Sequence, residues 1–203
     1  VTNGTTTTDG ITTSGGVITV SAVAGDVTLS QDADTTNAGA TPTGANVVLT
    51  GATNVTLNAG NIKGGTFGTV TLTGTAGAVT QPGAGVVTAN GLQVISANSS
   101  TLSNVGNDVT TVAAKITGAV GNTFTYKDAA TVDIGTVTDG TTTTNGITTK
   151  GGVITVSTVT GDVTLSKDAD TTNAGGTSTG ANVVLTALDN VGLSNVTLNA
   201  GNI

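Results

Sequence analysis

The chain repeats itself over a long period. Residues 1–50 match residues 137–186 at an offset of 136, and 42 of these 50 positions are identical. After residue 186 the second copy gains five residues and then rejoins the first, because residues 195–203 equal residues 54–62. Self-similarity at a fixed period is typical of repeat architectures. We therefore expect one continuous segment over 1–203, with a full long repeat, 1–136, and an incomplete second copy, 137–203.

A shorter period of apolar segments lies inside the long one. One set begins at Val27, Val47, Val70 and Leu92, and a second set begins at Val55, Val79 and Leu102. Within each set the segments recur at a nearly constant spacing, and turn-forming Asn and Gly residues separate them. The spacing predicts short strands in coils of about 20–24 residues. The long repeat would then hold about six coils, with the five-residue insertion absorbed at a turn.

Within each segment, apolar and polar residues alternate. Val27 and Leu29 share one side of an extended chain, while Thr28 points to the other. Aromatic residues are only 1% of the chain, so its core must be thin and aliphatic, as in a narrow solenoid and unlike an immunoglobulin-like sandwich. The pattern predicts an all-β fold, a parallel β-helix. The residues expected to point inward are Val27, Leu29, Val47, Leu49, Val70 and Leu72.

The composition argues against several classes of function. The net charge is −7 and the five lysines are scattered, which disfavours binding to nucleic acid. No apolar run is long enough to span a membrane. Among the usual acid–base residues, His, Glu and Cys are missing, and only Asp, Lys and one Tyr remain. We therefore expect no catalytic residues, no cofactor and no enzymatic activity.

Two recurring carboxylate pairs are the candidate sites. They are Asp32 with Asp34 and Asp168 with Asp170, each followed by a Thr-Thr-Asn segment. Their hard oxygen atoms suit Ca²⁺, although the calcium-binding nonapeptide repeat is absent and the fragment 64–68 comes nearest to it. The alternative is a solvated turn held by Asx hydrogen bonds. Paired aspartates also serve polysaccharide hydrolases, the less favoured enzymatic interpretation.

Threonine pairs raise one more alternative. Thr-x-Thr pairs such as Thr41/Thr43 and Thr71/Thr73 would form an ice-binding surface if they recurred at the same place in every coil. Their irregular spacing favours a simpler interpretation, in which threonine is the outward half of the alternation.

Several segments resemble the repeats of filamentous-haemagglutinin-like exoproteins, which are also described as β-strand repeats of autotransporter adhesins. The resemblance rests on Thr80-Gln81, Gly91-Leu92, Leu102 with Asn104, Gly106 to Ala114, Gly118 to Val120, Gly146 to Thr149 and Gly161 to Leu165. It implies a right-handed parallel β-helix, export across the outer membrane, and a role in adhesion or biofilm.

These observations predict a structural rod in a secreted bacterial surface protein, acting as an adhesin stalk, a biofilm component or an extracellular filament. The expected partners are neighbouring solenoid repeats or further copies stacked end to end, together with glycans or proteins of a host or matrix. The alternative is a coat resembling a surface layer and stabilised by calcium. The expected location is the bacterial cell surface or a secreted extracellular fibre.

Overall fold

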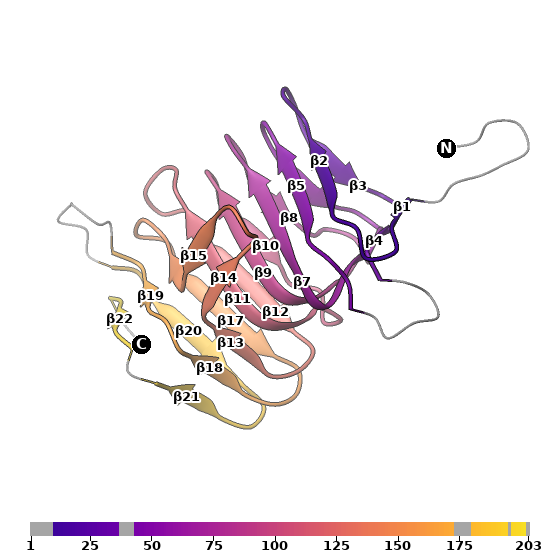
Figure 1. The fold of residues 1–203 in the computed structure, drawn as a ribbon. Coiled ribbons are helices and arrows are strands. Elements are labelled where there is room, and N and C mark those ends of the chain that lie inside the picture. Colours follow the sequence, from indigo (N-terminus) through magenta and orange to yellow (C-terminus); the bar gives the residue numbers. More distant parts are fainter. Residues whose placement is uncertain (1–9, 37–42, 173–179, 195, 202–203) are drawn as a thin grey trace, which may run out of the picture.

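The computed structural model describes residues 10–36, 43–172, 180–194 and 196–201. These residues form 22 strands and no helix, so none of them belongs to a helix that could cross a membrane. Two long parallel sheets run through the molecule, and the chain passes between them as it winds (Figure 1). The fold is therefore the parallel β-solenoid that the alternation predicts.

Three faces surround the core of the first five coils. The first face holds β1 (Ile11–Thr12), β4 (Ala33–Asp34) and the beginnings of β7 (Ile62–Gly74), β9 (Val87–Ser96) and β11 (Asp108–Ile116). The second face holds β2 (Ile18–Ser21), β5 (Val47–Gly51) and the ends of β7, β9 and β11. Both faces belong to one 13-stranded sheet, because β7, β9 and β11 run across the corner between them.

The remaining strands complete the third face and the later coils. The third face is a seven-stranded sheet of β3 (Val27–Leu29), β6 (Val55–Leu57), β8 (Val79–Thr80), β10 (Ser100–Leu102), β12 (Phe124–Asp128), β17 (Ile154–Thr158) and β20 (Val183–Thr186). Two further rows extend the larger sheet beyond β11. They are β13 (Val132–Ile134), β18 (Val163–Leu165) and β21 (Val191–Leu193), and β16 (Ile147–Thr148), β19 (Ala169–Asp170) and β22 (Leu198–Asn199).

Aliphatic side chains stack in register through the core. One row runs through Ile18, Val47, Val70, Leu92, Val112, Ile134 and Leu165, and ends at Leu193, which is 55% exposed. All six residues expected to point inward belong to the core or pack against it, with Leu29 partly buried. Each fully buried Val, Leu or Ile contributes about 1.5–3 kcal/mol through the hydrophobic effect. Phe124 and Tyr126, both fully buried on β12, fill the interior of one coil.

The coil length varies more than the sequence suggests. Along the row above, the spacing from Val47 to Ile134 stays within the expected range. The coils before Val47 and after Ile134 are all longer than this range. Two expected pairings are also wrong, because Val27 pairs with Val55 rather than Val47, and Leu102 lies two positions out of register with Val79. Periodicity alone does not distinguish the faces of a solenoid.

The long repeat does not span a whole number of coils. β2 lies in the 13-stranded sheet, whereas its equivalent in the second copy, β17, lies in the seven-stranded sheet. β3 and its equivalent β18 show the opposite exchange. One long repeat thus winds through five complete coils and about a third of another, rather than six. Equivalent strands of the two copies consequently lie one face apart.

In the structure, residues that follow the start of the five-residue insertion still occupy the places of the residues 136 positions earlier. β21 pairs with β18 as β6 pairs with β3, and Asn190 N donates to Asp162 Oδ1 (2.9 Å) as Asn54 N donates to Asp26 Oδ1 (2.9 Å). The extra Val191-Gly-Leu193 fills the place of β6. Leu198 and Asn199, which match Leu57 and Asn58 in sequence, lie further along and form β22, which pairs with β19. The expectation that a turn absorbs the insertion is therefore wrong.

A hairpin leaves the solenoid between β13 and β16. Its strands, β14 (Thr136–Thr138) and β15 (Thr143–Asn145), are antiparallel, and the hairpin folds back over the second face (Figure 1). Asp139 Oδ2 accepts from Thr71 Oγ1 (3.1 Å), and Gln93 Nε2 donates to Thr144 Oγ1 (2.7 Å). Thr71 and Gln93 face away from the core and are nevertheless buried, because the hairpin covers them.

Candidate functional site

The first carboxylate pair lies at the start of β4. Asp32 Oδ1 accepts from Asn61 N (2.8 Å) on the next coil. Asp34 Oδ1 accepts from the main-chain N (2.8 Å) and Oγ1 (2.6 Å) of Thr36, which is an Asx turn. Both carboxylates therefore fix local backbone geometry, which is the simpler of the two interpretations that the sequence left open.

Lys63 occupies the space between these carboxylates. Its Nζ lies 3.3 Å from Asp32 Oδ2 and 3.3 Å from Asp34 Oδ2. The pKa of Lys63 is raised, and the main cause is its hydrogen bond with Asp32. The pKa of Asp32 is lowered, and the main cause is the backbone hydrogen bond from Asn61. Burial alone would raise the pKa of Asp34, but hydrogen bonds from Thr36 and Lys63 outweigh it and lower that pKa.

The second pair repeats the turn without the lysine. Asp168 Oδ1 accepts from Thr197 N (2.8 Å), and Asp170 Oδ1 accepts from the N (2.7 Å) and Oγ1 (2.6 Å) of Thr172. The ladder partner of Asp170 is Asn199, whereas that of Asp34 is Lys63. Within the described ranges, no three Asp side chains gather closely enough to hold a metal ion, and His, Cys and Glu are absent from the sequence.

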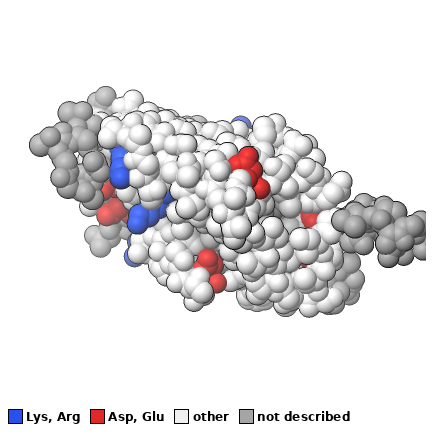
Figure 2. Space-filling view, turned by 90° about the horizontal axis from the view of Figure 1, so that it is seen from above, with Lys and Arg blue, Asp and Glu red and all other residues white. Residues whose placement is uncertain are grey.

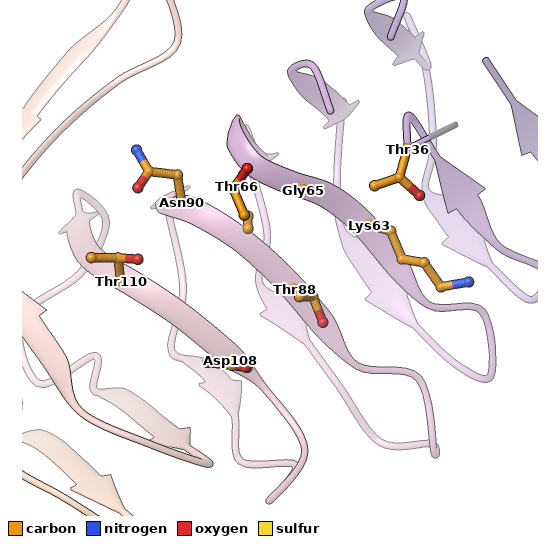
Figure 3. A pocket seen from close by; sticks show the side chains of 9 residues that line it. Thr36, Lys63, Gly65, Thr66, Thr88, Asn90, Asp108 and Thr110 are labelled. Atoms are coloured by element: carbon orange, nitrogen blue, oxygen red, sulfur yellow. The ribbon is translucent and has the colours of Figure 1, made fainter. Parts of the chain in front are cut away.

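A polar hollow on the first face begins at Lys63. We call it the flank groove; its volume is about 350 Å³, and it crosses four coils (Figure 3). Its lining residues are Thr36, Lys63, Gly65, Thr66, Thr88, Ala89, Asn90, Asp108 and Thr110. The strand register explains their convergence: Lys63 pairs with Thr88, and Thr88 pairs with Asp108. Outward side chains of successive coils thus stand in one row.

The wall of the flank groove is a bulge in β7. Between Gly65 and Thr69 this strand has two more residues than the facing part of β9, where Ala89 and Gly91 are the partners. Extra residues in one strand leave the ladder and project outward. Gly65, with φ +68°, has no side chain to fill the floor. The bulge falls within the fragment 64–68, which the sequence singled out only for its likeness to a calcium repeat.

The Thr71/Thr73 pair does not form an open surface. Thr71 is buried beneath the β14–β15 hairpin, and its hydroxyl also donates to Gln93 Oε1 (3.1 Å). Thr41 lies outside the described residues. An ice-binding face needs hydroxyls exposed in matching rows, and this part of the second face does not provide them.

Asp128 is buried beside Tyr126. Tyr126 Oη donates to Asp128 Oδ2 (2.5 Å), which also accepts from Val109 N (3.0 Å), while Oδ1 accepts from Ala130 N (2.9 Å). Burial raises the pKa of Asp128 despite these hydrogen bonds, and burial also raises the pKa of Tyr126 well above its usual value. These hydrogen bonds tie β12 to Val109 on β11 and to the turn at Ala130.

No protein-family model, curated protein or solved structure matches this chain.

Proposed function

We propose that the chain is a rod-forming segment of a secreted bacterial surface protein of the filamentous-haemagglutinin-like kind, and that it acts as an adhesin stalk or extracellular fibre component. The observation that supports this proposal is the unbroken row of inward residues from Ile18 to Leu193, paired in parallel from coil to coil. In the two parallel sheets each strand pairs only with strands of the neighbouring coils, so the length of such a rod is set by the number of coils.

The surface chemistry is consistent with an exposed rod. Charged side chains are few on the face shown in Figure 2, and most of that face is uncharged. The polar exterior consists largely of threonine, asparagine and serine, which keep a rod hydrated without extensive ion pairing. The resemblance noted above supports a location on the bacterial cell surface, and the parallel in-register pairing from coil to coil supports the stacking of further repeats or copies end to end.

Tandem arrays of one, two and three long repeats test the rod. With coils about 4.8 Å apart, each added repeat should lengthen the particle by about 26 Å at constant width. Small-angle X-ray scattering measures both dimensions. A particle that widens as repeats are added, or that stays the same length, would refute the proposal. Antibodies against the chain should label intact cells of the source organism, and labelling only after lysis would contradict the surface location.

The second candidate is a coat protein stabilised by calcium. It is favoured by Asp168 and Asp170, whose position lacks the lysine found at the first pair. Calcium should then raise the midpoint of thermal unfolding, and the gain should disappear in the variant Asp168→Asn/Asp170→Asn. An unchanged midpoint at millimolar calcium would exclude this candidate.

A further inference from the structure

The flank groove presents hydrogen-bonding groups that the protein does not use. The side chains of Thr88, Asn90, Asp108 and Thr110 stand on the outer side of β9 and β11 and are exposed. Within the described residues, none of these four side chains has a hydrogen bond to the protein. The polar side chains at the turns, by contrast, are hydrogen-bonded within the protein. Asp34, for example, accepts hydrogen bonds from Thr36. The groove therefore offers hydroxyl, amide and carboxylate groups that are free to meet a ligand.

The charge around the groove disfavours acidic ligands. Lys63 is its only cation, and both carboxylates of the first pair hold the ammonium group at 3.3 Å. Three aspartates, Asp32, Asp34 and Asp108, against one lysine give a local net charge of −2. A carboxylated or sulfated ligand would meet this charge without a free cation to pair with it. The chemistry of the groove thus suits a ligand rich in hydroxyl groups and without negative charge.

The spacing of the free groups suits a chain of repeating units. Thr88 and Asp108 are ladder partners, so they stand one coil apart, about 4.8 Å along the axis. Asn90 and Thr110 form a second row, because each lies two residues beyond a member of the first row. One coil is comparable in length to one pyranose unit of an extended glycan. Successive sugars can therefore meet equivalent side chains on successive coils.

We propose that the flank groove binds a neutral oligosaccharide laid along the solenoid axis. The free hydroxyl and amide groups donate to and accept from sugar hydroxyls, and the β7 bulge forms the side wall. Phe67, the next residue along that bulge, is 73% exposed but does not line the groove. This inference rests on the proposed adhesive role and gives its expected glycan partner a chemical class and a site.

Titration calorimetry with defined hexasaccharides tests the proposal. The probes are cellohexaose and N-acetylchitohexaose, which are neutral, and hexagalacturonate, which is acidic. At least one neutral probe should bind, and the acidic probe should bind at least tenfold more weakly at low ionic strength. The absence of binding by both neutral probes at millimolar concentration would overturn the proposal. Stronger binding of hexagalacturonate would overturn it too, because it would make Lys63 an anion site.

Variants locate the binding. Thr88→Val/Asn90→Ala removes two free polar groups at exposed positions and should weaken binding at least tenfold. Thr101→Val, an exposed position on β10 outside the groove, is the matched control and should bind normally. Thr110→Asp adds a charge without removing bulk and should also weaken binding. Circular dichroism checks that each variant is folded. Equal affinity of the folded groove variants and the control would place the glycan elsewhere and refute the site.

Discussion

Replacing Asp128 should expose how much the buried polar cluster contributes to stability. In Asp128→Ala, Tyr126 Oη and Val109 N lose their acceptor inside the protein, and Ala130 N loses its partner at the edge. A buried donor left without a partner costs about 1–3 kcal/mol. The two fully buried donors therefore predict a loss of about 2–6 kcal/mol, a large fraction of the 5–15 kcal/mol typical of whole domains.

The pH dependence identifies the protonation state of Asp128. Burial raises its pKa in the folded chain, so the folded state holds this proton more tightly than the unfolded state does. Its stabilising contribution is therefore complete below the unfolded pKa, about 3.9, and is lost as pH rises through the higher folded pKa. Asp32, Asp34 and Asp139, whose pKa values are lowered, contribute the opposite trend.

The control is Asp128→Asn, which keeps the shape and cannot ionise. The pH dependence contributed by all other titratable groups is the same in wild type and in this variant. It therefore cancels in the difference between their unfolding free energies. That difference should be largest at pH 3 and should shrink toward pH 7, as measured by urea denaturation followed by circular dichroism. A difference that grows with pH would mean that the fold stabilises the Asp128 carboxylate as an ion, and the reasoning would be wrong.

Three further predictions concern other parts of the solenoid. Leu72→Ala should lower the unfolding free energy by about 2–5 kcal/mol, whereas Thr101→Ala should change it by less than about 0.5 kcal/mol; equal losses in urea denaturation would show that the facing assignment is wrong. Gln93→Leu should remove the bond to Thr144 and raise amide hydrogen exchange in β14 and β15, and unchanged exchange would show that the hairpin is held by other contacts. Lys63→Gln should cost no more than about 1 kcal/mol because the pair is partly exposed, but it should raise the pKa of both joined carboxylates in NMR titrations; unmoved values would show that the lysine does not hold them.

The sequence was sufficient for the architecture because its strongest signal is local. Alternation within Val47-Val-Leu49 and Val70-Thr-Leu72 determines which side chains enter the core, and both pairs are fully buried as expected. The face to which each strand belongs depends on the number of residues in each coil, and that number changes with the length of the loops. That is why Val27 was matched with Val47, although the structure pairs it with Val55.

The candidate site was only partly predictable. The pairs Asp32/Asp34 and Asp168/Asp170 were visible as Asp-x-Asp in both copies. The role of Lys63 depends on a neighbour 29 residues away across one coil, and no local pattern reveals it. The flank groove requires four coils in register and a bulge at Gly65. The run Gly64-Gly65 was the available signal, since paired glycines inside a strand pattern suggest a bulge.

The displacement of equivalent strands by one face has a consequence for how such a chain can grow. Ile18 is paired with Val47, and its equivalent Ile154 is paired with Phe124, yet the inward Ile18 and Val20 recur unchanged as Ile154 and Val156. Among the described residues, only one of the eight differences, Ala22 against Thr158, falls at an inward position next to the core. The interior thus accepts the same segment in different surroundings. A duplicated segment can therefore end at any strand and need not span a whole number of coils. Each added copy is then rotated about the solenoid axis relative to the copy before it, so that its equivalent residues face a different side of the rod.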